Sequence, residues 1–334
     1  MRTIGFVLLL CAPALAAVTG TVVNRTTGQP QPGATVSLYK LGQENGFELI
    51  DQAQSDDRGK FTINQQIQGP HVIRTGFDGV TYNHMLSPDS PATNLTLEVY
   101  NSSRQAGAAR VGKHMILFQP GGGQMLVNET YLCGNDGKTA WNNPAAGTLQ
   151  FYLPPAAKGK VQVNATAPAG MPIAAAVKKT SKSDVYAVDF PVKPGETRFD
   201  LSYTVPYTEG AAYAGKIVTK DDNTYLIAAA GVTIQGENLN DLGLEPRTQA
   251  HIYGLTGSSY KVELTGAAAA APEENADAAD SDSGPRIEAI MPRIYGRTKL
   301  ILALALGALA LGLALLYRAA PPTATKETNA RGGR

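Results

Sequence analysis

The sequence predicts an all-β protein, with two β-sandwich regions in tandem followed by one C-terminal transmembrane helix. The first indication is turn chemistry, because 35 glycines and 21 prolines are spread along the 334 residues and favour many short strands. The second is the alternation of apolar and polar residues, which is clearest in ETRFDLSYTV at 196–205. The third is a run of 18 uncharged residues at 300–317, long enough to cross a bilayer as a helix.

The chain begins with a segment typical of a secretory signal peptide, to which we assign residues 1–17. Arg2 provides the positive start, and a short apolar run follows that is too short to span a membrane. Ala14 and Ala16 place small side chains three and one residues before the expected cut. We therefore predict signal cleavage at Ala16 and export of the rest of the chain.

Residues 18–103 are expected to form the first sandwich. In one strand Ala34, Val36 and Leu38 alternate with polar residues, and a later turn is followed by Phe61 and Ile63 in the same alternation. Short strands separated by turn residues in this way are typical of a β-sandwich.

Four short motifs in this first region have a recognisable order. They are Gly20-x-Val22, Thr27-Gly28-x-Pro30, Gly33-Ala34-x-Val36 and Asp57-x-Gly59-x-Phe61. Together they resemble the carboxypeptidase regulatory-like module, whose fold is a seven-stranded, transthyretin-like sandwich. The resemblance implies a non-catalytic module of the kind that accompanies peptidases, surface receptors or adhesins. The whole chain resembles membrane-anchored bacterial proteins that carry such a domain.

Residues 104–265 are expected to form a second, larger region of Ig-like sandwich character. Glycines at 121–123 and the Pro194–Gly195 pair mark turns. The pattern leaves open whether this region is one sandwich or two. The predicted strands are HMILFQP, QMLVNETYL, GTLQFYLP, KVQVNAT, ETRFDLSYTV and SYKVEL.

Residues 266–298 are predicted to be a disordered, acidic, Ala-rich linker, because 266–285 contain no aromatic or β-branched residue. The predicted transmembrane helix covers 299–318, with ends at Leu300 and Tyr317, and 319–334 form a short tail. We expect a single pass through the cytoplasmic membrane of a bacterium. The body then lies in the periplasm or outside, and the tail lies in the cytoplasm.

Composition and motifs exclude several classes of function. The chain has 29 basic and 28 acidic residues, so it has no overall field to attract nucleic acid. The positions three after the histidines hold no glutamate, and there is no His-Glu-x-x-His, Cys-x-x-Cys or Gly-x-Ser-x-Gly. We therefore predict no catalytic residue, no metal ligand, no cofactor and no enzyme activity. The histidines are His71, His84, His114 and His251.

Two of these histidines and the cysteines have simple expected roles. His71 and His84 lie in the first region, where we expect surface histidines rather than a pair of ligands. Cys11 belongs to the signal segment, which leaves Cys133 without an intrachain partner. We expect Cys133 to be a small buried apolar residue.

Two aromatic residues are the candidates for binding. Trp141 is the only tryptophan, in the loop-like KTAWNNP, and it either plugs a core or stacks on a sugar ring. If Phe151 faces inward with Leu149 and Leu153, Tyr152 lies on the opposite face of its strand. A tyrosine in that position is available for a ligand.

The expected function is non-enzymatic: a membrane-anchored envelope protein that binds protein or polysaccharide, or supports envelope assembly. Small-residue spacing in the membrane segment favours a homodimer only weakly. One alternative is an envelope hydrolase or an accessory subunit of one. The other is a eukaryotic type I surface glycoprotein, because five Asn-x-Ser/Thr triplets occur, at Asn24, Asn94, Asn101, Asn128 and Asn164.

Overall fold

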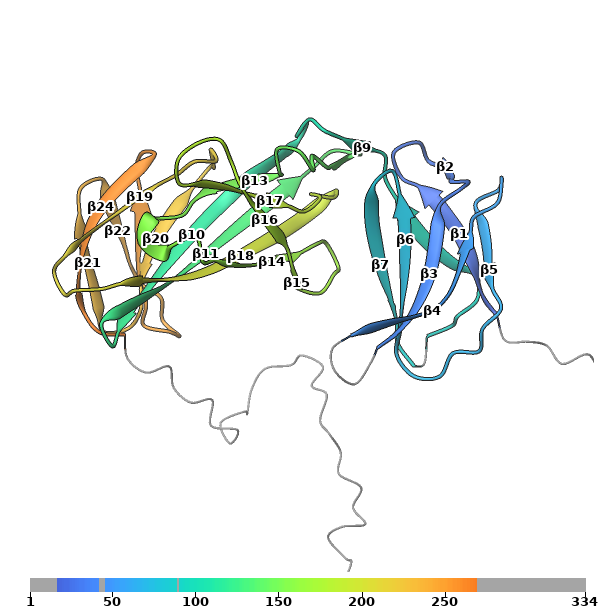
Figure 1. Cartoon of the computed structure of the whole chain (residues 1–334), viewed down its shortest axis with the longest axis horizontal. Helices are drawn as coiled ribbons and strands as arrows, with labels where there is room; N and C mark the ends of the chain where they lie inside the picture. The colour runs from blue at the N-terminus through green and yellow to red at the C-terminus, as the bar shows by residue number, and fades with distance from the viewer. Residues whose placement is uncertain (1–16, 42–45, 89, 269–334) are drawn as a thin grey trace, which may run out of the picture. The chain divides into compact units, whose positions relative to one another are not determined.

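The computed structural model describes residues 17–41, 46–88 and 90–268 (Figure 1). These residues form β-strands, with one 3-10 turn, η1 (Pro155–Ala157), as their helical element, so the all-β prediction is confirmed. In these ranges no helix has the length and apolar character needed to cross a membrane. The signal segment with Ala16, the linker and the predicted span from Leu300 to Tyr317 lie outside the described residues.

The first region consists of two sheets. In one, β1 pairs with β2 and β5 in antiparallel fashion and with β8 in parallel fashion; the other has the order β4-β3-β6-β7. The strands are β1 (Val18–Asn24), β2 (Gln29–Pro30), β3 (Thr35–Leu41), β4 (Phe47–Gln54), β5 (Lys60–Ile63), β6 (His71–Phe77), β7 (Val80–Leu86) and β8 (Leu95–Val99).

The inward faces of these sheets bury the residues that the alternation indicated. Val36, Leu38, Phe61 and Ile63 all belong to one buried apolar cluster. The prediction for His71 is wrong: this side chain is buried, and its Nδ1 lies 3.0 Å from the carbonyl oxygen of residue 69. β6 carries buried residues at three successive positions at its start, because both of its faces are covered there.

The second region is built on an eight-stranded sheet of order β15-β14-β18-β11-β10-β20-β23-β22. Its centre is the long hairpin of β10 and β11, which turns through Gly122 and Gly123; both have positive φ, which glycine adopts without strain. The strands are β10 (Ala109–Gly121), β11 (Gln124–Asn135), β14 (Gln162–Thr166), β15 (Ile173–Ala174), β18 (Gly195–Pro206), β20 (Thr224–Ala228), β22 (Leu239–Leu244) and β23 (His251–Leu255).

Two three-stranded sheets pack on one face of this large sheet. Their orders are β13-β17-β16 and β19-β24-β21. The strands are β13 (Leu149–Tyr152), β16 (Ala176–Lys179), β17 (Val185–Asp189), β19 (Ala212–Lys216), β21 (Val232–Gly236) and β24 (Ser259–Gly266). A further short pair joins β9 (Ser102–Ser103) to β12 (Ala140–Trp141).

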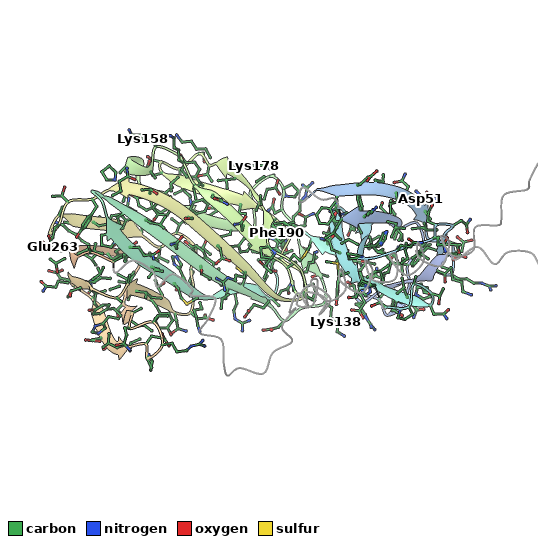
Figure 2. All side chains as sticks on the ribbon, turned by 90° about the horizontal axis from the view of Figure 1, so that it is seen from below. Asp51, Lys138, Lys158, Lys178, Phe190 and Glu263 are labelled. Carbon is green, nitrogen blue, oxygen red and sulfur yellow. The ribbon has the colours of Figure 1, made fainter. Side chains whose placement is uncertain are left out.

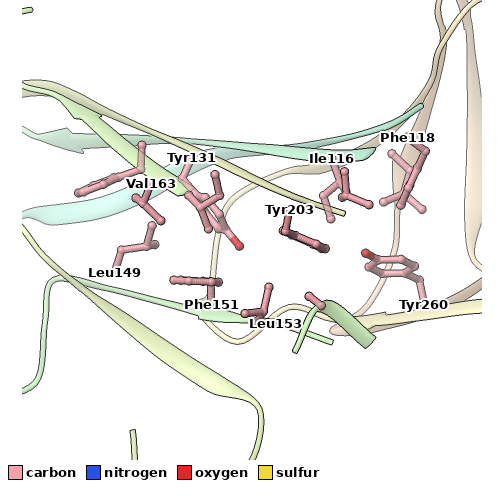
Figure 3. Close-up of a cluster of buried hydrophobic side chains, with 14 of the residues drawn as sticks. Ile116, Phe118, Tyr131, Leu149, Phe151, Leu153, Val163, Tyr203 and Tyr260 are labelled. Carbon is pink, nitrogen blue, oxygen red and sulfur yellow. The ribbon is translucent and has the colours of Figure 1, made fainter. Parts of the chain in front are cut away.

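A single apolar core lies between the large sheet and both small sheets. Phe151 of β13 and Val262 of β24 belong to the same cluster as Phe199 of β18, and Figure 3 shows the side chains of this cluster between the strands. The second region is therefore one sandwich whose smaller face is split in two. The alternation predicted for β18 is confirmed, because Phe199, Leu201 and the residues in phase with them are buried.

The two small sheets meet along a line that we call the seam. β13 is the outer strand of one sheet and β19 is the outer strand of the other. Thr219, which follows β19, joins them: its Oγ1 donates to the carbonyl oxygen of Gln150 at 2.6 Å and accepts from the backbone N–H of Gln150 at 3.3 Å. The seam thus brings two unpaired strand edges next to each other.

Candidate functional site

A carboxylate lies inside the core of the second region. On β11 the inward positions alternate, and Glu129 occurs in phase with the buried Val127 and Tyr131. The Glu129 side chain is only 5% exposed. Removing a carboxylate from water is costly unless its oxygens receive hydrogen bonds, so the surroundings of Glu129 decide whether it can be there.

Three side chains donate to the Glu129 carboxylate. His114 Nε2 lies 2.9 Å from Oε2, Tyr131 Oη donates to Oε2 at 2.9 Å, and Tyr203 Oη donates to Oε1 at 2.7 Å. The strand register explains the arrangement, since His114 is directly opposite Tyr131 and Tyr203 is directly opposite Val127. Three adjacent strands thus each supply one donor to the same carboxylate.

The His114 imidazole is held between two carboxyl groups. Its Nδ1 lies 3.6 Å from Asp221 Oδ2, which is an ion-pair contact too long for a hydrogen bond. Asp221 itself accepts a hydrogen bond from Thr224 Oγ1 at 2.7 Å. The imidazole also stacks on the Tyr131 ring, with centroids 3.8 Å apart. Burial lowers the pKa of His114, but its contacts with Asp221 and Glu129 more than offset this, so the pKa lies above its ordinary value.

The phenols around Glu129 are neutral donors. Burial, reinforced by the nearby Glu129, raises the pKa of Tyr131 and of Tyr203 well above the ordinary value. The pKa of Tyr260 is raised well above it too, first by burial and then by Tyr213. Figure 3 shows the rings of Tyr131, Tyr203 and Tyr260 among the aliphatic side chains of the core. We call His114, Glu129, Asp221, Tyr131 and Tyr203 the buried polar cluster.

Hydrogen bonding continues from this cluster toward the seam. Tyr213 Oη lies 3.1 Å from Tyr203 Oη. Because the single hydroxyl proton of Tyr203 goes to Glu129, Tyr213 is the donor in this bond. The rings of Tyr213 and Tyr260 follow with centroids 6.2 Å apart. Tyr260 is the last of these buried phenols, and it lines a groove at the surface.

The groove lies at the seam and has a volume of about 670 Å³. Tyr152 of β13 forms one side of it, and residues of β19, β21 and β24 and of the turn after β21 form the rest. The Lys216 ammonium lies 5.6 Å from the centroid of the Tyr152 ring, within the range of a cation–π contact. We call this feature the seam groove; its other polar lining residues are Gln235, Glu237, Asn238, Ser259, Lys261 and Glu263.

The two predicted binding residues have different surroundings in the structure. Tyr152 is half-buried on the face of β13 opposite Leu149 and Phe151, as parity predicted, and it reaches the seam groove. Trp141 packs against the core of the second region, and its Nε1 donates to the carbonyl oxygen of Arg104 at 3.2 Å. Trp141 is not among the residues that line the groove.

Cys133 is buried on the inward face of β11, as expected, and is a free thiol. Burial raises the pKa of this thiol to about 12, so it carries no thiolate at neutral pH. Within the described ranges, no cluster of three or more His, Cys, Asp or Glu side chains is arranged to hold a metal ion. His84 is exposed, and His251 Nε2 lies 2.6 Å from Asp241 Oδ1 at the surface.

Sequence reasoning missed the buried polar cluster, although one signal was present. Glu129 follows Met125 and Val127 and precedes Tyr131 and Cys133 at a period of two, so the strand places it on the inward face. Two of its partners carry the same signal, since His114 is in phase with Ile116 and Phe118 on β10, and Tyr203 is in phase with Leu201 and Val205 on β18. Asp221 carries none. Asp221 belongs to the turn before β20, and only the fold brings it to His114.

Comparison with known proteins finds no family model that matches this chain and no curated protein that is similar to it. The function of the chain is therefore inferred from its own residues, above all from the buried polar cluster and the seam groove.

Proposed function

We propose that this chain is a non-enzymatic envelope protein, anchored in the membrane, that displays β-sandwiches for binding. The observation that supports it most is the state of its densest group of ionisable side chains. His114 and Glu129 are nearly sealed from solvent and are bonded to each other and to core phenols. Buried side chains that are hydrogen-bonded to one another in this way hold strands together, whereas a catalytic acid or base must reach a substrate.

The first sandwich, in this proposal, is a carboxypeptidase regulatory-like module. Three of the four motif glycines lie where glycine is unstrained and other residues are not: Gly28, Gly33 and Gly59 all have positive φ, near 70°. A Cβ on Gly59 would also lie 2.6 Å from the carbonyl oxygen of Val22. The motif residue Phe61 is buried in the core that these turns enclose. The motif residues thus have structural reasons to be there: the glycines allow the tight turns, and Phe61 fills the core.

The proposed address is the cytoplasmic membrane of a bacterium, with the sandwiches in the periplasm or outside. It depends on the sequence of the two ends: a signal-like start and an uncharged apolar run at 300–317. Washing native membranes with alkaline carbonate should leave the intact chain in the pellet. Release of the intact chain into the wash would contradict the proposed membrane anchor.

Binding and catalysis can be separated in one assay. The full-length chain in detergent is incubated with native envelope fragments, and both retention on the fragments and soluble breakdown products are measured. Retention without protein-dependent release of sugars or peptides supports a binding protein. Protein-dependent release would instead favour the hydrolase alternative. A fall in apparent mass after glycosidase treatment of the native protein would favour the surface-glycoprotein alternative.

A further inference from the structure

The seam groove has unusual surroundings for a surface depression. It begins where two sheet edges meet, β13 and β19, each paired on one side only, and it continues across β24 to the end of β21. Natural proteins usually cover or blunt such edges. Here Tyr152 and Lys216 lie on the two facing edges, with the ammonium over the ring at 5.6 Å from its centroid. The groove is thus lined by residues of both small sheets.

The exposed polar side chains of the groove make no ion pair or side-chain hydrogen bond to any described residue. Two are ammonium groups, Lys216 and Lys261, and two are carboxyl groups, Glu237 and Glu263. Glu263 points outward from β24 (Figure 2). Opposite charges that line one groove without pairing leave donors and acceptors available to a ligand. The amide side chains of the lining add further groups of both kinds.

The balance of charge restricts the chemistry of the ligand. Two positive and two negative groups give the groove no net attraction for a polyanion or a polycation. A ligand rich in hydroxyl groups suits it better, because each hydroxyl both donates and accepts a hydrogen bond. The Tyr152 ring provides an apolar face of the kind on which the C–H groups of a sugar ring stack.

The floor of the groove is held rigidly. Gly215 has no side chain, and a Cβ at that position would overlap the ring of Tyr260. Tyr260 contacts Tyr213, whose hydroxyl bonds to Tyr203 and through it to Glu129. A floor that is already ordered loses little conformational entropy when a ligand binds. The buried polar cluster thereby supports the groove without touching the ligand.

We propose that the seam groove binds a glycan chain, with one sugar ring on Tyr152 and with sugar hydroxyls bonded to the unpaired charged and amide groups around it. The proposal rests on the function proposed above, and it names the ligand class and the surface. The other ligand that strand edges can accept is an extended peptide. The polar lining favours the glycan, and the peptide becomes an outcome of the test.

The test is co-sedimentation of the full-length chain in detergent with four insoluble glycans: peptidoglycan sacculi, chitin, cellulose and starch. The wild type should sediment with at least one of them. Tyr152→Ala should weaken this retention about tenfold, the loss expected for one stacking contact of about 1.4 kcal/mol. Lys216→Gln should weaken it less. Tyr225→Ala is the matched control, because Tyr225 is a half-buried strand tyrosine of β20 outside the groove.

Other outcomes would contradict the proposal that the groove binds a glycan. Retention on none of the four glycans, or equal retention of Tyr152→Ala and wild type, would overturn the proposal while leaving the non-enzymatic function in place. Tyr152-dependent capture of unfolded, carboxymethylated lactalbumin in the absence of glycan retention would replace the glycan by a peptide. Soluble sugar released from a retained polymer would contradict the non-enzymatic function and leave the groove as its binding site. Circular dichroism and melting curves verify that each variant is folded.

Discussion

His114 Nε2 lies 2.9 Å from Glu129 Oε2, and both side chains are almost completely buried in the core of the second region. One residue lies on β10 and the other on β11, so the pair bridges the two central strands of the large sheet. Tyr131 and Tyr203 complete the bonding of Glu129 from the same strand and from β18. A buried polar cluster of this kind makes strand register specific, because a slip would leave the Glu129 carboxylate without its donors.

Glu129→Ala should destabilise the protein strongly. The change leaves the buried imidazole and two phenols without their shared acceptor, and removing one partner of a buried pair costs about 3–5 kcal/mol. Urea unfolding followed by tryptophan fluorescence measures the effect. Glu263→Ala is the control, since this carboxyl group is exposed, and its effect should be close to zero. A Glu129→Ala loss as small as the control would mean that the cluster does not stabilise the fold.

Stability should fall as pH rises above neutral, and His114 should cause part of this fall. The folded pKa of His114 is raised above the ordinary 6.5, against the effect of burial, by Asp221 and Glu129. The folded state therefore holds the proton more tightly than the unfolded chain. This stabilisation is fully present below pH 6.5 and is lost as pH rises through the folded pKa. The raised pKa values of Tyr131 and Tyr203 extend the loss to stronger alkali.

Urea midpoints measured from pH 6 upward check the contribution of His114. The His114→Gln variant should start less stable and show a flatter decline, because it has no imidazole to lose its proton. The charged and titratable groups that face His114 are Glu129, Asp221 and the Tyr131 phenol, and they are unchanged in this variant. Parallel declines of variant and wild type would show that His114 does not titrate within this range.

Gly215→Ala should disturb the floor of the seam groove. The new Cβ would overlap the Tyr260 ring, which must then move within a packed core, at a cost of about 1–3 kcal/mol. Thermal melting measures the loss. Gly134→Ala serves as the control, because Gly134 also lies in a strand but its Cβ would meet no atom within 4 Å. Equal melting temperatures of the two variants would contradict the close packing of Tyr260 on Gly215.

Cys133 should be unreactive in the folded protein. Its thiol is buried, and burial raises its pKa to about 12, so the reactive thiolate is scarce at pH 8. In a Cys11→Ser chain, a thiol reagent such as dithionitrobenzoate should label Cys133 only as fast as the protein unfolds. Adding urea should therefore speed up labelling in step with the unfolding curve. Rapid labelling in buffer alone would place this thiol at the surface.

The sequence predicts best those strands in which apolar and polar residues alternate along most of the strand. β18 shows the alternation over its whole length, and β13 shows it around Phe151. The predicted strands leave out β19 to β23, which extend from Ala212 to Leu255. Each of these strands has only five or six residues, so the alternation covers too few positions to be recognised, although β20 and β21 contain strand-favouring Thr, Tyr, Ile and Val.

Local sequence patterns were enough to predict the all-β class, the inward residues of the longest strands, the turn glycines and the burial of Cys133. These features depend on a residue and its near neighbours, through φ preferences and a period of two. The three-dimensional fold was needed to show that the second region has one core with a split smaller face, that Asp221 lies near His114, and that Lys216 lies over the Tyr152 ring. Those relationships join residues far apart in the chain, and their energies arise only when strand pairing has brought the residues together.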